Sequence, residues 1–195
     1  MNFFEVFELP RRLAIDGEDL QRRFYALARR THPDFHQTAP PAERAAIEEQ
    51  AALVNAAYRT LRDPIARVDY LVRLEEGRAT KEGAEARPKA PPALLAEMFE
   101  IQEALAEARA GSLDDATRAT LVQQRDHLLE RYAAEEARLR GPLAERWDGA
   151  AAAERPAALT ALKEALAVRA YLRTVINDLA DLLGEEESGV AHHRH

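Results

Sequence analysis

The chain has 195 residues, of which 47% are hydrophobic and 31% are charged, and its formal net charge is −7. These values are typical of folded globular proteins, and the length allows one or two domains with sizeable cores. The sequence contains no cysteine, which excludes disulfides, thiolate metal sites and cysteine nucleophiles. No apolar run is long enough to cross a bilayer, and the first residues lack the pattern of a secretory signal. We therefore expect a cytoplasmic protein that does not bind membranes.

The charged residues are unevenly distributed. Residues 1–75 carry 11 basic and 12 acidic side chains, whereas the remainder carries 16 basic and 22 acidic ones. The N-terminal part can therefore present a local basic surface, while the C-terminal part repels anions. The negative net charge also argues against nucleic acid as a partner.

The residue pattern predicts an all-α protein. Alanine, leucine, glutamate and arginine dominate, and no alternating β-branched run occurs. Residues 76–93 hold two glycines, three prolines and almost no apolar side chain, which is typical of a linker or exposed connection. We therefore predict one helical domain over residues 1–75, a second over residues 94–183, and a disordered tail over residues 184–195.

Apolar spacing within residues 1–75 predicts a helical hairpin. Asp16 is a candidate N-cap, and the helix after it repeats apolar residues every three or four positions until Pro33 ends it. A short aromatic segment, residues 3–9, precedes this helix, and a last helix begins at Asp63-Pro64. The second long helix of the hairpin has the same period, with the stripe Ile47, Ala51, Val54, Tyr58 and Leu61. Two stripes of matching length joined by a short loop predict antiparallel packing.

The C-terminal part predicts an antiparallel three-helix bundle. Its helices are expected over about 93–110, over about 114–140, and from Pro156 onward. Trp147 lies in the connection before the last helix, and we expect it to pack against the end of that helix.

The tip of the predicted hairpin carries the trio His32-Pro33-Asp34. A proline turn holds its imidazole and carboxylate in fixed places, and guanidinium groups on the preceding helix suit an acidic partner surface. Those groups belong to Arg22, Arg23, Arg29 and Arg30. Taken alone, the trio also fits an ordinary exposed loop, and the arginines fit a solvated helix face. A hydrolase is disfavoured, because no nucleophile, phosphate loop or metal-ligand spacing accompanies the trio.

The surrounding sequence resembles the J-domain family over residues 1–75. The matching segments are LQRRFYALARRTHPD and AALVNAAYRTLRDPIARVDYL, after an aromatic entry segment. The resemblance implies a protein that binds the ATP form of a DnaK-type ATPase chaperone and stimulates its hydrolysis, without being an enzyme or needing a cofactor or metal. It makes His32, Pro33 and Asp34 the required trio and matches the four arginines to the family's basic face. Phe35 stands where many J-domains have lysine, which removes one cation and bears on partner choice.

The combination of an N-terminal J-domain with an acidic three-helix C-terminal domain resembles the HscB family of iron–sulfur cluster co-chaperones. The matching residues are the opening FFEVFELP, the segment LLAEMFE, the Trp147-Asp148 pair and the final helix around Tyr171. This resemblance implies that the protein delivers an IscU-like scaffold protein to an HscA-like chaperone. The alternative is a J-domain co-chaperone whose C-terminal bundle binds a different client. We expect a monomer or a weak dimer.

The first helix of the predicted bundle carries a candidate scaffold-binding surface. At 100° per residue, Leu94, Met98, Ile101 and Leu105 form its core face. An apolar strip, Leu95 and Phe99, lies beyond that face, beside a mainly acidic strip, Ala96, Glu100, Glu103 and Glu107. Such a pair of strips suits a partner with a basic rim. The family resemblance adds Tyr171 to this candidate scaffold-binding surface.

Several features leave this surface open to other interpretations. Ala96 stands where the family often has methionine. Leu95 and Phe99 also suit a wide core stripe, and the glutamates suit a solubilising face. On spacing alone, Tyr171 suits packing within the bundle better than binding.

Overall fold

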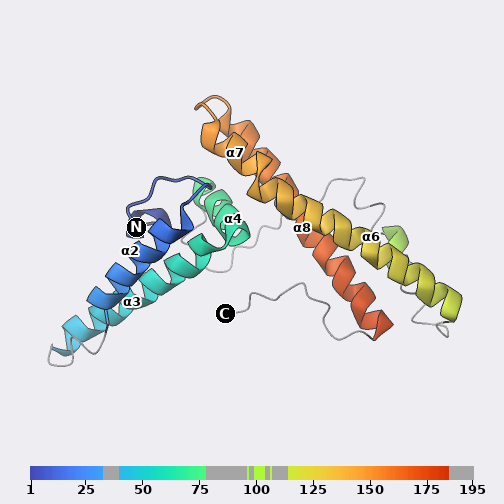
Figure 1. The fold of residues 1–195 in the computed structure, drawn as a ribbon, viewed down its shortest axis with the longest axis horizontal. Coiled ribbons are helices and arrows are strands. Elements are labelled where there is room, and N and C mark those ends of the chain that lie inside the picture. Colours follow the sequence, from blue (N-terminus) through green and yellow to red (C-terminus); the bar gives the residue numbers. More distant parts are fainter. Residues whose placement is uncertain (33–39, 78–95, 97–98, 104–105, 107–113, 185–195) are drawn as a thin grey trace. The chain divides into compact units, whose positions relative to one another are not determined.

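The computed structural model describes residues 1–32, 40–77, 96, 99–103, 106 and 114–184 (Figure 1). Its helices are α1 (Phe3–Val6), α2 (Gly17–Arg30), α3 (Pro41–Arg62), α4 (Pro64–Glu75), α6 (Asp115–Arg140), α7 (Pro142–Gly149) and α8 (Arg155–Leu183). Residues 96, 99–103 and 106 are helical as well, and these ranges contain no strand. The all-α prediction is therefore confirmed for them. None of their helices is both long and apolar enough to span a membrane.

The chain divides into two compact units. Unit 1 comprises Met1–Ala84 and Pro142–Leu159, and unit 2 comprises Glu85–Gly141 and Thr160–His195. Unit 1 thus draws on two stretches of sequence that are far apart. Most of the linker expected over residues 76–93, and all of the tail expected over residues 184–195 except Gly184, lie outside the described residues.

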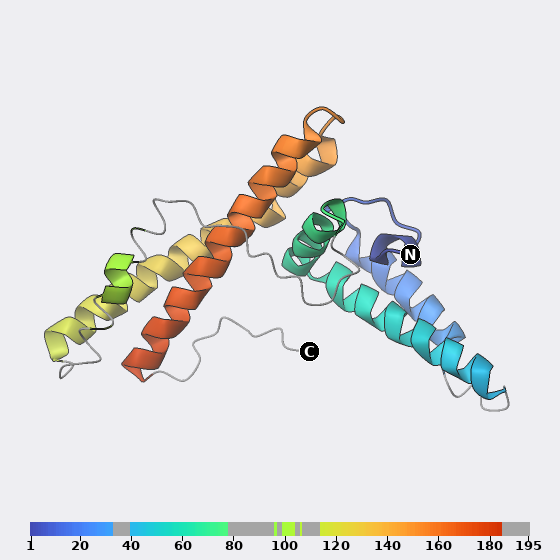
Figure 2. The same cartoon turned by 180° about the vertical axis from the view of Figure 1, so that it is seen from behind.

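Helices α2 and α3 form the predicted hairpin of unit 1 and lie side by side in Figures 1 and 2. The N-cap prediction is confirmed, because the Asp16 carboxylate accepts hydrogen bonds from the backbone N–H of Glu18 at 2.9 Å and of Asp19 at 3.2 Å. Helix α2 ends at Arg30, and the hydroxyl and N–H of Thr31 both donate to the Leu27 carbonyl. The helix therefore stops two residues before the expected end at His32.

Aromatic and aliphatic side chains fill the core of unit 1. Phe24 of α2 stacks on Tyr58 of α3 with ring centroids 4.0 Å apart. Phe3 stacks on Tyr70 of α4 at 4.4 Å, and the Tyr70 hydroxyl accepts a 2.8 Å hydrogen bond from the Phe3 N–H. Burial raises the pKa of Tyr70. The fully buried side chains around these contacts include Phe4, Phe7, Leu20, Leu61 and Leu71.

A buried arginine closes the base of the hairpin, at the end away from His32. Arg67 of α4 is only 6% exposed, and its Nε donates to the Leu61 carbonyl at 2.6 Å, in the last turn of α3. Its Nη1 donates to the carbonyl of Leu13, in the loop between α1 and α2. Burial lowers the pKa of the Arg67 guanidinium, and the charges of Asp63 and Asp148 oppose that effect. Three segments of unit 1 therefore meet at this side chain.

Helices α6 and α8 pack antiparallel in unit 2 (Figures 1 and 2). Arg118 near the start of α6 donates to the carbonyl of Leu183 at the end of α8, at 3.1 Å. Near the end of α6 and the middle of α8, Arg169 of α8 donates two hydrogen bonds to Glu136 of α6. The Arg169 guanidinium also lies over the Tyr132 ring at 4.9 Å. Their shared core contains Ile101, Leu121, Leu128, Tyr132, Leu172, Val175, Ile176, Leu179 and Leu183. Most of the bundle's first helix, expected over 93–110, lies outside the described residues.

A helix, α7, occupies the stretch that the sequence predicted as a connection. Gly141-Pro142 does end α6, but Pro142 also begins α7, because proline suits the first turn of a helix. Trp147 lies in α7 and is 1% exposed, with Arg155, the first residue of α8, over its ring at 5.1 Å. Trp147 therefore lies beside the start of the last helix as expected, but in a helix rather than a loop.

Candidate functional site

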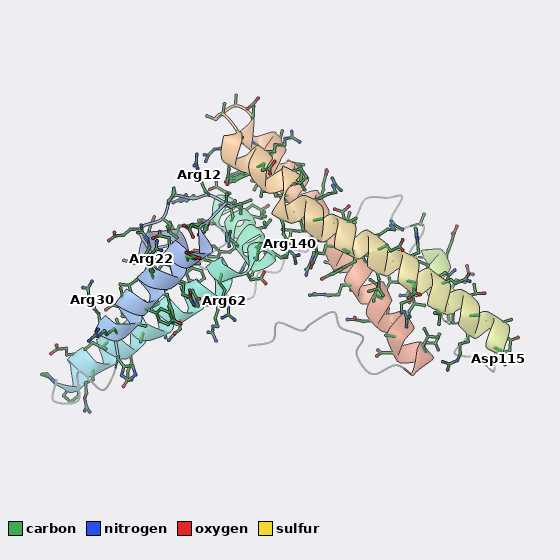
Figure 3. The ribbon with its side chains drawn as sticks, viewed as in Figure 1. Arg12, Arg22, Arg30, Arg62, Asp115 and Arg140 are labelled. Atoms are coloured by element: carbon green, nitrogen blue, oxygen red, sulfur yellow. The ribbon has the colours of Figure 1, made fainter. Side chains whose placement is uncertain are left out.

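Three of the four predicted arginines are exposed on α2. The Arg22 side chain is 67% exposed, and Arg29 and Arg30 are exposed in the last turn. The negative end of the helix dipole favours cations in that turn. Figure 3 labels Arg22 and Arg30 on the same helix, ahead of the hairpin tip. The basic face predicted from the sequence is thus present on the surface.

Arg23 differs from the other three arginines because it holds α2 against the residue that follows α1. Its guanidinium donates to Asp19 at 2.8 Å and to the backbone carbonyl of Phe7 at 2.9 Å. Arg22 also donates to Asp19, at 3.0 Å. The hydrogen bond from Arg23, and to a smaller extent the one from Arg22, lowers the pKa of the Asp19 carboxyl. Arg23 therefore has a structural role in addition to the binding role predicted for it.

His32 is exposed two residues beyond the end of α2. Pro33 and Asp34 lie outside the described residues, so His32 is the one member of the trio whose surroundings the structure gives. Its position at the end of the basic face is the one that the sequence predicted.

Tyr25 is a surface residue that the sequence analysis missed. Its side chain is 62% exposed, one turn from Arg22 and one turn from Arg29 on the same face of α2. The Gln21 amide donates to its hydroxyl at 3.4 Å, and its ring lies 5.6 Å from that of Phe24. Its spacing from the two arginines was visible in the sequence, but the apolar-stripe argument considered only residues facing the core.

The predicted scaffold-binding surface is partly described. Phe99 is 70% exposed, which excludes the alternative that it widens the core, and Ile101 is buried as expected. The remaining described members of the predicted surface on this segment are also exposed, namely Ala96, Glu100 and Glu103. Leu95 and Glu107 lie outside the described residues.

Tyr171 is half-buried and packs against the core of unit 2. Gln102 donates to Asp178 of α8 at 2.8 Å, which joins the segment carrying Phe99 to that helix. Asp178 lies seven residues after Tyr171, on the same face of α8 and about 10 Å along its axis. Tyr171 therefore lies on the face of α8 that this segment contacts. A hollow beside the segment is lined by Glu100, Ile101, Gln124, His127 and Leu128.

Comparison with known proteins gives consistent matches. A model of the DnaJ domain matches residues 2–70. The "Co-chaperone protein HscB homolog" of Vibrio cholerae serotype O1 (strain El Tor Inaba N16961) is 40% identical over 105 residues, 54% of this chain and 60% of that protein. The homolog from Ralstonia nicotianae is 36% identical over 129 residues, 66% of this chain and 72% of that protein.

A solved structure shows the same fold. "Chaperone HscB from Vibrio cholerae" superimposes with a TM-score of 0.59 at 27% identity, over 93% of this chain and 96% of that one. The match to the Vibrio cholerae sequences spans about three fifths of their length.

The helical hairpin and the match over residues 2–70 make the chain a J-domain protein. The similarity to HscB proteins extends beyond the J-domain. It covers 72% of the Ralstonia relative and 96% of the Vibrio structure, which narrows the class of J-domain protein. The chain belongs to the HscB co-chaperone family.

Proposed function

We propose that this protein is a co-chaperone that binds the ATP form of an HscA-like, DnaK-type chaperone and stimulates its ATPase. The observation that carries the proposal is the exposed arginine face of α2 leading to the exposed His32. Guanidinium groups and an aromatic ring, here Tyr25, are the side chains most enriched at strong protein-binding sites. Hydrolysis takes place in the partner, so the J-domain acts by binding one state of that partner more tightly than the other.

We further propose that unit 2 binds an IscU-like scaffold protein and brings it to the chaperone. The support is an exposed phenylalanine beside exposed glutamates on one short helical segment. An exposed apolar side chain with an acidic border suits a partner whose own apolar patch has a basic rim. A different client with the same surface chemistry is the second candidate, and direct binding to the scaffold distinguishes the two.

The scaffold-binding surface is tested by reversing its charge. In the full chain, the double substitution Glu100→Lys and Glu103→Lys is expected to weaken scaffold binding by about 10-fold or more, because like charges then face each other. Stimulation of the chaperone ATPase without scaffold should stay unchanged. Calorimetric titration with the scaffold and steady-state ATPase rates measure the two effects.

A matched control carries the same charge change on α8, at the exposed residues Glu164 and Asp181. This control should bind the scaffold as the unaltered protein does. If the Glu100/Glu103 variant lost scaffold binding and ATPase stimulation together, the assignment of two separate surfaces would be wrong.

The contribution of Tyr25 is tested on the other surface. Tyr25→Ala is expected to weaken binding of the ATP-bound chaperone by about 10-fold, since an aromatic ring at the centre of an interface contributes more than 1 kcal/mol. Tyr25→Phe keeps the ring and should retain most of the affinity. Surface plasmon resonance with immobilised chaperone measures both variants, and equal affinities for Tyr25→Ala and the unaltered protein would remove Tyr25 from the interface.

A further inference from the structure

Asp19 is an acidic residue within the basic face of α2. At about 100° per residue, its side chain projects between two rows of arginines. Arg22 and Arg29 lie about 60–80° around the helix to one side of it. Arg23 and Arg30 lie about 20–40° to the other side. The dipole of α2 favours an acid in this first turn, but it does not account for an acid placed among the arginines.

Two of the four arginines bond to this carboxylate. Arg22 Nη2 donates to Asp19 Oδ1 at 3.0 Å, and Arg23 Nε donates to Oδ2 at 2.8 Å, so each carboxylate oxygen accepts from one guanidinium. The carboxyl stays ionised near neutral pH, since the Arg23 bond first and the Arg22 bond second lower its pKa. Two cations of the basic face are therefore engaged within the helix before any partner binds.

The far end of the basic face lies out of reach of Asp19. Arg29 follows Asp19 by ten residues, about 15 Å along the helix axis, and His32 lies further on. A carboxylate on so short a side chain does not bond a guanidinium over that distance. Asp19 therefore acts on the first part of the face and leaves the part next to His32 unaffected.

We infer that Asp19 is a positioning residue that holds Arg22 and Arg23 within α2 and thereby lowers the affinity of the basic face for the acidic surface of the ATP-bound chaperone. A carboxylate of the partner bonds these guanidiniums fully only when it displaces Asp19, which also repels it. A strongly acidic surface competes with Asp19 for both arginines, whereas a weakly acidic one gains little from them. The inference deepens the proposed function and rests on it, because the chaperone is the partner.

Neutralising Asp19 in the full chain tests the inference. Asp19→Asn is expected to bind the ATP-bound chaperone about 3-fold more tightly at about 50 mM salt, an effect of the size that exposed ion pairs have. At about 0.5 M salt the gain should fall below about 1.5-fold, because surface charges are then screened. Surface plasmon resonance with immobilised chaperone measures both affinities.

The fold of α2 should survive this substitution, because the Asp16 side chain still caps the helix. Circular dichroism checks this directly. Asp19→Ala is a second variant that removes the acceptor altogether and places a strong helix former in the first turn. It should bind the chaperone as tightly as Asp19→Asn does.

Asp69→Asn is the matched control. Asp69 of α4 is 52% exposed and pairs with Arg73 at 3.0 Å, four residues later, as Asp19 pairs with Arg23. The control thus makes the same change of charge and breaks the same kind of ion pair on a different helix. Its affinity for the chaperone should stay within about 1.5-fold of that of the unaltered protein at both salt concentrations.

A double substitution separates positioning of the arginines from simple repulsion of the partner. Arg22→Gln should weaken binding by less than about 2-fold in the otherwise unaltered chain, because Asp19 already engages that guanidinium. The same change in the Asp19→Asn background should weaken binding by about 3-fold or more. Equal losses in the two backgrounds would show that Asp19 acts by repulsion alone and would overturn the inference.

The inference and the proposed function fail in different ways. If the unaltered chain binds the chaperone but neither Asp19→Asn nor Asp19→Ala binds it more tightly at low salt, the inference alone is wrong. If the unaltered chain binds no DnaK-type chaperone, the proposed function is wrong and the inference falls with it.

Discussion

Replacing His32 by glutamine is expected to reduce stimulation of the DnaK-type ATPase by about 10-fold or more, to near the rate of the chaperone alone. His32 is exposed and follows the end of α2, so the substitution disturbs neither the helix nor the core. The helical circular dichroism spectrum and the thermal midpoint should therefore be unchanged. Steady-state phosphate release, with the chaperone limiting and the co-chaperone varied, measures the effect.

The matched control for this substitution is His127→Gln, the same change at an exposed position in unit 2. In an assay without scaffold it should stimulate as the unaltered protein does. Retention of substantial stimulation by His32→Gln would show that the imidazole is not the group that the chaperone recognises.

Replacing Arg67 by alanine is expected to destabilise unit 1 by about 3–5 kcal/mol. The guanidinium is 6% exposed and satisfies the carbonyls of Leu61 and Leu13, which belong to different segments of the unit. Alanine leaves both acceptors without this donor and opens a cavity. It also removes a positive charge that interacts with Asp148. Urea unfolding followed by the fluorescence of Trp147, the single tryptophan, measures this loss in the unit that contains it.

Two comparison variants separate this effect from a general loss of charge. Arg12→Ala removes an exposed guanidinium from the same loop and should change the unfolding free energy of unit 1 by less than about 0.5 kcal/mol. Arg67→Lys keeps the charge but has only one donor nitrogen, so its unfolding free energy should lie between those of Arg67→Ala and Arg12→Ala. An Arg67→Ala variant as stable as Arg12→Ala would contradict the role given to this side chain.

Local sequence signals predicted the helices that have strong periods and clear end signals. Asp16 and Asp63 both cap the helices expected after them, and Val54 and Leu61 of the predicted stripe are buried. The same spacing placed Ile101 in the core, where it is buried, but left open whether Phe99 lies beyond the core or on a wide core stripe. These features depend on residues within one or two turns of each other, which is the range that a sequence pattern reports.

Contacts between distant segments were not predictable in this way. The hydrogen bonds from Leu13 and Ala14 to Asp148 join residues separated by 135 and 134 positions, and no periodicity relates them. Helix α7 was missed because it spans eight residues and begins at the proline that also marks the end of α6. The Trp147-Asp148 pair was noticed as a family resemblance, but its structural role required the coordinates.

The sequence predicted which residues make up the candidate site better than it predicted what each of them does. The sequence grouped Arg22, Arg23, Arg29 and Arg30 as equivalent, whereas the structure has Arg23 bonded to the Phe7 carbonyl. Tyr25 was overlooked because an exposed aromatic residue lies outside both the apolar stripe and the basic pattern. Tyr171 was predicted as a contact through resemblance, and its packing against the unit 2 core is what spacing alone favoured.

The measurement that tests the account most directly is the steady-state ATPase rate of an HscA-like chaperone, titrated with the full chain in the presence and absence of an IscU-like scaffold. We expect the chain alone to raise the rate and the scaffold to raise it further, because one protein then presents both the J-domain and its client. No increase with the chain under either condition would contradict the central claim that this J-domain drives a DnaK-type ATPase.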